Sequence, residues 1–171
     1  MISIDKSSTL SKVSKYLNDI VQVVNIKEPL VEKSIVEIPV LYGDAFGPDL
    51  ERVATHCGIT MNEVVKRHSE GSYLVYFIGF SIGFPYFGGM DHTLSTPRLE
   101  NPRKSVPKGS IAIAGTQTGV YPLSSPGGWN LIGKTPLSIF NVDKPNESML
   151  KMGDSVRFKP VDLNAFKKLS L

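Results

Sequence analysis

The chain has 171 residues, the length of one ordinary domain or of one domain with a short appendage. Its net charge of +3 is too weak to indicate a nucleic-acid-binding protein, and its 41% hydrophobic and 20% charged residues exclude a disordered chain. A single cysteine, Cys57, excludes an internal disulfide framework and a multi-cysteine metal site, and we predict no metal site.

The N-terminus and the hydropathy pattern bear on where the protein resides. No apolar run approaches the roughly 18 residues of a membrane-spanning helix. Residues 1–6 lack the basic head and apolar middle of a signal peptide. We therefore expect a cytoplasmic protein that binds neither membranes nor nucleic acids.

The first forty residues predict a helix and then a strand. Residues 9–21 carry apolar side chains at helical spacing. Residues 34–42 alternate as a strand does, and Pro39 favours a strand at the edge of a sheet or a strand end.

Two short helices separated by a glycine turn follow. Gly47-Pro48-Asp49 predicts a helix start, with Asp49 complementing the positive end of the helix dipole. Cys57 lies on the apolar face of this helix, which favours a buried structural thiol over a nucleophile, and Gly58 ends the helix. Thr60-Met61-Asn62-Glu63 is a capping box that starts the second helix, which runs to about His68.

The remainder of the chain predicts strands joined by turns. Residues 73–80 are apolar throughout and predict a strand buried on both faces. Residues 110–114, 137–140 and 155–161 predict further strands, the last one after a turn at residues 152–154. Short strands joined by turns favour a mainly β fold, either a closed barrel or a sandwich.

Glycine and proline concentrate in one stretch. Sixteen of the twenty-seven lie between Gly79 and Gly133, interleaved with large aromatic side chains. Rings beside tight turns indicate ordered loops on a scaffold, where binding residues commonly lie. We therefore expect the functional site in this stretch.

Two arginines in this stretch follow prolines. Each arginine follows a proline, in Thr96-Pro97-Arg98 and in Asn101-Pro102-Arg103, and the fixed proline backbone limits where the guanidinium group can lie. Guanidinium groups bind carboxylates and phosphates in bidentate geometry. The alternative is a pair of solvated surface arginines.

A polar turn with an aromatic anchor follows at Ser124-Ser125-Pro126-Gly127-Gly128-Trp129, and its glycines could present backbone N–H groups to an anion. The alternative there is a hairpin turn capped by a packed tryptophan.

Three further polar side chains are candidates for orienting a small ligand. Gln117, Thr118 and Tyr121 place an amide, a hydroxyl and a phenol in one turn-rich segment, although such a loop can also satisfy its own backbone. His68 lies at a helix end, where the dipole favours the charged imidazolium. Helix capping is the alternative to a role for His68 as a general acid or base.

Taken together, these segments resemble one family over residues 35–161. The matching motifs lie, in chain order, at residues 37–43, 47–50, 76–86, 96–103, 106–110, 117–122, 125–129, 133–135 and 153–158. This is the family of the 5-oxoprolinase B subunit, also called allophanate hydrolase subunit 1, which includes the sporulation-kinase inhibitor KipI. Two positions depart from the family pattern: Ile82 replaces a proline, and Asp44 replaces the second glycine after Tyr42.

The resemblance implies a cyclophilin-like β-barrel over residues 36–171, preceded by a partial α+β segment at residues 1–35. That segment is expected to be what remains of a small domain, either in a truncated relative or in a chain that packs with another copy. The implied function is that of the B subunit of a bacterial ATP-dependent 5-oxoprolinase. Together with the C subunit and a third component it would open 5-oxoproline to glutamate, with ATP, and Mg²⁺ where ATP requires it, bound by the complex.

On this interpretation Arg98 and Arg103 pair with the substrate carboxylate or with phosphate, and Gln117, Thr118 and Tyr121 orient the lactam, with His68 as acid or base. The loop from Ser124 to Gly128 would supply backbone donors to an oxyanion or a phosphoryl oxygen. Ser125, Gly127, Gly128 and Trp129 are its expected substrate-binding residues. The alternative function is that of an inhibitor that docks on a sensor histidine kinase through the same aromatic surface.

Overall fold

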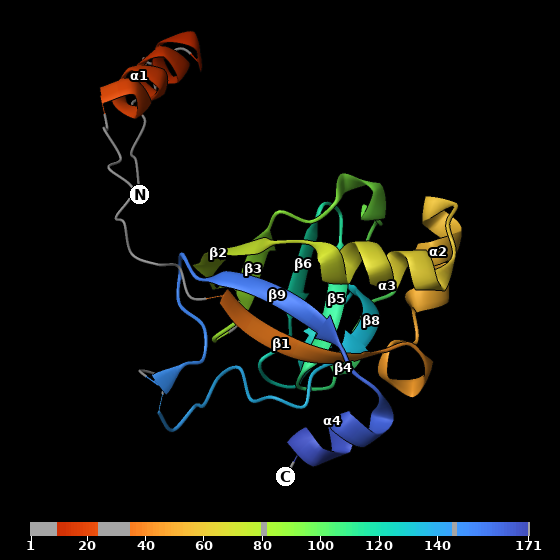
Figure 1. The fold of residues 1–171 in the computed structure, drawn as a ribbon. Coiled ribbons are helices and arrows are strands. Elements are labelled where there is room, and N and C mark those ends of the chain that lie inside the picture. The colour runs from red at the N-terminus through yellow and green to blue at the C-terminus, as the bar shows by residue number, and fades with distance from the viewer. Residues whose placement is uncertain (1–9, 24–34, 80–81, 145–146, 171) are drawn as a thin grey trace. The chain divides into compact units, whose positions relative to one another are not determined.

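The computed structural model describes residues 10–23, 35–79, 82–144 and 147–170 (Figure 1). The chain divides into two compact units, Met1–Glu32 and Lys33–Leu171, which are described separately. In the first unit, helix α1 (Leu10–Val23) lies where the sequence predicts a helix, and it exposes Tyr16, Leu17 and Ile20. Residues 1–9 and 24–34 of the predicted α+β segment lie outside the described residues.

In the described part of the second unit, seven strands close a barrel in the order β1-β8-β5-β6-β3-β2-β9 (Figure 1). Their bounds are Ile35–Tyr42 (β1), Tyr73–Ile78 (β2), Pro85–Gly88 (β3), Ser110–Ala114 (β5), Gln117–Val120 (β6), Asn130–Lys134 (β8) and Ser155–Pro160 (β9). The β1–β9 pair is parallel and the other pairs are antiparallel. The predicted mainly β barrel is confirmed.

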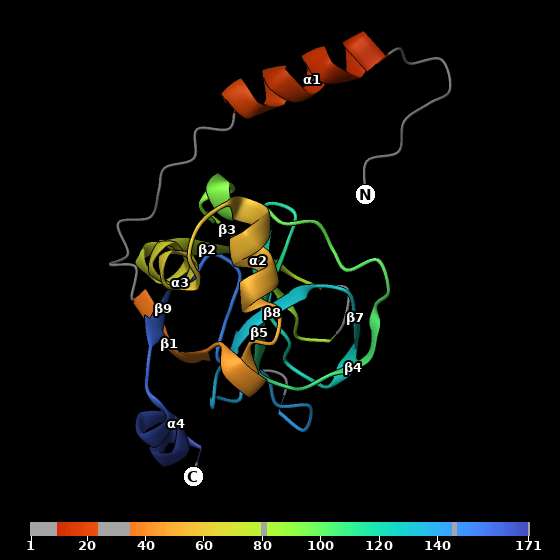
Figure 2. The same ribbon diagram turned by 90° about the vertical axis from the view of Figure 1, so that its right-hand side faces the viewer.

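A second, two-stranded sheet stands beside the barrel (Figure 2). It pairs β4 (Arg103–Val106) with β7 (Ser125–Gly127) in antiparallel fashion. This sheet covers a second face of strand β5, all five of whose residues are buried. Ile111 and Ile113 pack in the barrel core, whereas Ala112 and Ala114 pack in a separate cluster with Val106, Tyr121 and Trp129. A β-strand sends alternate side chains to opposite faces, so β5 serves both clusters.

Short helices pack on the outside of the barrel (Figure 1). They are η1 (Asp44–Phe46), α2 (Leu50–Cys57), α3 (Met61–Glu70), η2 (His92–Leu94) and the C-terminal α4 (Leu163–Leu169). Thr60 accepts a hydrogen bond from the Glu63 backbone N–H at 3.1 Å, as the capping box predicts. Gly58 ends α2 in the left-handed conformation at φ 67°. Among the described residues, no helix has the length and apolar content to cross a lipid bilayer.

Two strand predictions are wrong in part or in full. Residues 137–140 form no strand; Ile139 and Phe140 are instead buried as parts of a loop, with the Ile139 carbonyl accepting from the Met149 N–H. The strand predicted over residues 73–80 ends at Ile78, and it is not buried on both faces, because the register shifts after Val75 and the next two side chains are exposed. Phe80 lies outside the described residues.

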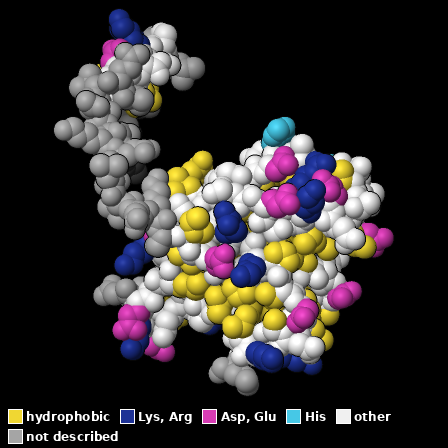
Figure 3. Space-filling model, viewed as in Figure 1, with side chains coloured by type: hydrophobic (Ala, Val, Ile, Leu, Met, Phe, Trp, Pro, Cys, Tyr) yellow, Lys and Arg dark blue, Asp and Glu magenta, His cyan; other side chains and the backbone are white. Residues whose placement is uncertain are grey.

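The face that carries β1 and β9 shows patches of hydrophobic side chains between charged ones (Figure 3). Pro39 lies in the part of β1 that pairs with β9 alone. A proline is tolerated there because one side of the strand needs no hydrogen-bond donor, as the sequence predicts.

Candidate functional site

A small pocket lies between the barrel and the two-stranded sheet, and we call it the aromatic pocket. Its volume is about 70 Å³. The residues that line it come from the glycine- and proline-rich stretch, and they are Phe84, Tyr86, Arg98, Tyr121, Ser125, Pro126, Gly127, Gly128 and Trp129. Six of the predicted site residues therefore meet at one hollow, as the sequence predicts: Arg98, Tyr121, Ser125, Gly127, Gly128 and Trp129.

The aromatic walls hold one another in place. Phe84 contacts the Trp129 and Tyr121 rings edge to face, with centroids 5.4 and 5.3 Å apart. Tyr86 meets Trp129 in the same way at 5.9 Å. Phe84, Tyr121 and Trp129 are all buried, so the walls are fixed by the fold and do not need a ligand to order them.

Arg98 stands at the mouth of this pocket. Its guanidinium carbon lies 5.9 Å from the centroid of the Trp129 ring, within the range of a cation–π contact. The Arg98 side chain is exposed and makes no ion pair or hydrogen bond with any other described residue. Its five N–H donors are therefore available to an anion that enters the pocket.

Tyr121 brings a neutral hydroxyl group to the pocket wall. Burial raises the pKa of Tyr121, against smaller opposing effects of the Trp129 backbone and of Arg98, so the phenol stays protonated at neutral pH. Gly127 is required beside it, because a Cβ atom at this position would collide with the Tyr121 hydroxyl oxygen. The glycine thus lets β7 approach the phenol closely.

Arg103 has a different role from Arg98 in this structure. Its Nη2 donates to Asp49 Oδ1 at 2.7 Å, and Asp49 Oδ2 accepts from the Leu131 backbone N–H at 2.7 Å. Arg103 does not line the aromatic pocket, although its backbone pairs with Gly127 across the two-stranded sheet. The ion pair ties this sheet to β8, so Arg103 holds the pocket wall in position. Nothing in the sequence pattern had indicated this part played by Asp49.

His68 belongs to the barrel interior rather than to the pocket. It is fully buried and stacks on Phe158, with ring centroids 4.6 Å apart. Tyr42 donates to its Nδ1 at 2.8 Å, and Nε2 donates to Thr118 Oγ1 at 2.9 Å, because the Thr118 hydroxyl itself donates to the Ala112 carbonyl. Thr118 therefore points into the barrel, and neither residue lines the pocket.

Burial decides the charge of His68. It lowers the pKa of His68 to about 3, so the imidazole is neutral at physiological pH. The helix end predicts the charged form, but the cost of burying a cation outweighs the helix dipole here. Gln117 also lies outside the pocket lining, half-buried at the start of β6 opposite Ala114.

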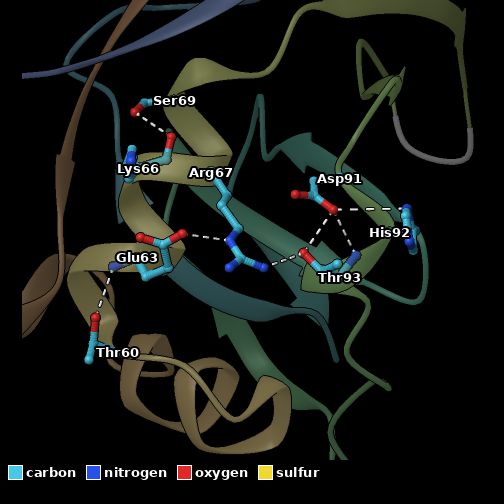
Figure 4. A network of polar contacts seen from close by, with 8 residues as sticks. All are labelled: Thr60, Glu63, Lys66, Arg67, Ser69, Asp91, His92 and Thr93. Carbon is cyan, nitrogen blue, oxygen red and sulfur yellow. Dashed lines mark hydrogen bonds and ion pairs between the residues drawn. The ribbon is translucent and has the colours of Figure 1, made fainter.

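A surface network that the sequence did not reveal holds the segment before Arg98 (Figure 4). Arg67 on α3 donates to Glu63 at 2.8 Å and to Thr93 at 2.9 Å. Asp91 accepts from the Thr93 backbone and hydroxyl at 2.9 and 2.8 Å, and these bonds lower the pKa of Asp91. The network joins α3 to η2, from which the chain runs on to the pocket.

Comparison with known proteins places the chain in a family. Residues 1–150 match the family model of the carboxyltransferase domain, subdomain C and D. The chain belongs to this family. It is 50% identical over 143 residues to the 5-oxoprolinase B subunit of Bacillus subtilis (82% of this chain, 60% of that protein). It is 54% identical over 129 residues to the protein of the same name from Escherichia coli O157:H7 (75% of this chain, 59% of that protein).

These relatives confirm the resemblance to the 5-oxoprolinase B-subunit family, and the chain spans about three fifths of their length. Among solved structures, a conserved uncharacterized protein from Pyrococcus horikoshii matches with a TM-score of 0.75 and 47% identity, over 93% of this chain and 72% of that one. The urea amidolyase of Kluyveromyces lactis, at 20% identity and a TM-score of 0.67 over 78% of this chain and 10% of its own, shares the fold alone.

Proposed function

We propose that this chain works in a 5-oxoprolinase complex that opens the ring of 5-oxoproline to glutamate at the expense of ATP. A C subunit and a third component would supply the other parts of the complex. One observation carries the proposal: a rigid aromatic pocket with an unpaired arginine at its mouth, in a chain about half identical to proteins named as the B subunit of 5-oxoprolinase.

The chemistry of 5-oxoproline suits this pocket. The molecule is a flat five-membered lactam that carries one carboxylate. Arg98 pairs with the carboxylate in the bidentate geometry that guanidinium groups favour, while the rings of Phe84 and Trp129 contact the lactam. A hollow of about 70 Å³ suits a compact ring better than a larger ligand.

Tyr121 and the adjoining backbone act on the lactam group itself. When a nucleophile attacks the lactam carbonyl, negative charge develops on its oxygen. A neutral phenol can donate a hydrogen bond to that oxygen, and the backbone N–H of Gly128, which also lines the pocket, would be a second donor. Gln117, Thr118 and His68 have no part in this proposal, because they lie outside the pocket lining.

We assign ATP to the complex rather than to the aromatic pocket. Pockets for drug-sized ligands usually measure about 300–1,000 Å³, several times the volume found here. Arg98 is also the only cation among the described residues that line the pocket, whereas a triphosphate calls for several. Opening of the ring therefore requires ATP bound outside the aromatic pocket.

The test is reconstitution of the complex from this chain, the C subunit and the third component, with glutamate formation as the readout. Arg98→Ala should lower kcat/KM by about 100-fold, mainly through KM, because it removes the partner of the carboxylate. Arg98→Lys should retain part of the activity. Arg157→Ala, at an exposed arginine on β9, is the matched control and should change nothing. Unchanged activity of Arg98→Ala would contradict the proposal.

A second candidate function is inhibition of a sensor histidine kinase, and an exposed apolar surface favours it. Tyr76, Phe77 and Ile82 are 57%, 45% and 67% exposed. Phe77 stacks on Tyr86 with centroids 4.3 Å apart, so this surface continues from the aromatic pocket. Large exposed rings of this kind are typical of protein interfaces.

The two functions can be separated by adding the protein to a purified sensor kinase and measuring autophosphorylation. If the chain is an inhibitor, it lowers autophosphorylation, and Phe77→Ser relieves the effect. Arg98→Ala would then have less influence than Phe77→Ser. Glutamate formation that is unaffected by Phe77→Ser, with no effect on the kinase, supports the first function.

A further inference from the structure

A second and larger groove lies where the barrel meets the C-terminal helix, and we call it the lysine groove. Its volume is about 310 Å³. The walls come from the turn before β5, from the end of β8 and the loop after it, and from α4. The lining residues are Lys108, Gly109, Lys134, Thr135, Pro136, Leu137, Ser138, Phe166 and Ser170.

The charged side chains that line this groove, among the described residues, are all positive. Lys108 and Lys134 line it, and no Asp or Glu is among the described residues that do so. Neither lysine forms an ion pair with a carboxylate in the described part of the chain. Lys108 Nζ donates to Ser138 Oγ at 2.9 Å, which leaves two of its three N–H groups free, and the Lys134 ammonium has no hydrogen-bond partner among these residues.

The backbone at Gly109 packs closely against Thr135 and against the side chain of Lys134. Gly109 has φ +83°, and a Cβ atom on it would lie 2.6 Å from the Thr135 carbonyl oxygen. The same atom would lie 3.6 Å from Lys134 Cγ, so the Lys134 stem runs along the bare face of the glycine. The Thr135 N–H donates to the Gly109 carbonyl at 2.9 Å and fixes the two walls to each other.

Two motifs meet at this groove that the aromatic pocket does not use. Residues 106–110 and 133–135 are both among the segments that carry the family resemblance. Neither lines the aromatic pocket. Gly109 and Thr135, which the motifs specify, line the lysine groove together with Lys108 and Lys134, which stand at positions that the motifs leave open. These motifs therefore contribute no lining residue to the proposed substrate site.

We infer that the lysine groove binds a phosphoryl group, either of free phosphate or of a larger phosphate ester. Lysine binds phosphate as a compact point charge, and two lysines with unspent donors line one hollow that contains no opposing carboxylate among the residues described. The hydroxyl of Ser138 lies beside them. The volume is in the range of small-molecule sites. This inference does not rest on the proposed function, because it involves none of the aromatic-pocket residues.

The test is a titration followed by backbone amide chemical shifts, at fixed ionic strength, with inorganic phosphate, tripolyphosphate and ATP as probes. Shifts should centre on residues 108–110, 134–138 and 166–170. Lys134→Gln and Lys108→Gln should each weaken binding by about tenfold, and Lys134→Arg should preserve it. Lys151→Gln, at an exposed lysine outside the groove, is the charge-matched control.

The probes distinguish the source of the phosphoryl group. ATP that binds at least about tenfold more tightly than tripolyphosphate indicates a nucleotide, whereas equal affinities indicate the phosphate chain alone. Loss of affinity in Lys151→Gln equal to that in Lys134→Gln would overturn the inference, and so would shifts centred on Trp129. Thermal unfolding of each variant separates lost binding from lost folding, and Lys134→Arg provides a folded reference.

Discussion

The aromatic pocket and the barrel interior at His68 are made of similar side chains, yet they differ in how their polar atoms are satisfied. In the interior, Tyr42, His68 and Thr118 form a chain of hydrogen bonds that ends on a backbone carbonyl. In the pocket, Arg98 lies at the mouth with no hydrogen bond or ion pair to another described residue. A polar group with all its partners inside the fold contributes to stability, whereas one that lacks them is available to a ligand.

The largest expected effect tests the interior. The pKa of His68 is about 3 in the folded chain and about 6.5 when unfolded. Between these values only the unfolded chain binds the proton, so the free energy of unfolding should fall as pH falls from 6.5 towards 3. The loss is about 1.4 kcal/mol per pH unit and up to about 5 kcal/mol in total. Denaturant unfolding at pH 7, 6 and 5 measures it.

The control for this prediction is His68→Gln, whose amide can still donate to Thr118. The variant is less stable at pH 7 but should lose the slope between pH 6.5 and 5. The surface carboxyls of Glu63 and Asp91, whose pKa values are lowered by hydrogen bonds, remain ionised above about pH 5 and do not produce this slope. Equal slopes in the wild type and the variant would show that His68 is not buried as a neutral imidazole.

Arg103 lies near the pocket, but like the interior residues it bonds to a partner within the fold, the buried carboxylate of Asp49. Arg103→Ala leaves the buried Asp49 without a cation and should lower the free energy of unfolding by about 2 kcal/mol, because a buried carboxylate loses a hydrogen-bond donor. Lys159→Ala removes the exposed partner of Glu37 and should cost less than about 1 kcal/mol. Denaturant unfolding of both variants decides. If both variants lose the same free energy of unfolding, Arg103 behaves as a solvated surface arginine and does not stabilise the fold.

Local signals predicted much of the fold. The capping box at residues 60–63 and the helix end at Gly58 both depend on contacts within a few residues, and both are found. The strand predicted over residues 137–140 failed because an apolar run also arises where a loop packs onto a core. Strand β7 was not foreseen, because it exists only through its pairing with β4, which precedes it by about twenty residues.

The site was predicted in the same uneven way. Arg98 and residues 125–129 line one pocket, as expected from the glycine, proline and aromatic residues concentrated in that stretch of the sequence. Thr118 lies outside the pocket, because its place on β6 turns the side chain toward His68 in the barrel interior. The ion pair of Asp49 with Arg103 joins residues 54 positions apart, and no local spacing reveals such a pair.

The smallest expected effect on stability compares two tyrosines directly. Tyr121→Phe removes a hydroxyl at the pocket wall and should change the free energy of unfolding by less than about 1 kcal/mol. Tyr42→Phe leaves Nδ1 of the buried His68 without a donor and should cost about 1–3 kcal/mol. In the reconstituted complex the order reverses. There Tyr121→Phe should lower kcat about tenfold, because the lactam oxygen loses a hydrogen bond, and Tyr42→Phe should leave kcat unchanged. If Tyr121→Phe proved the more destabilising of the two and kept full turnover, the pocket hydroxyl would be structural, and the distinction between the two regions would not hold.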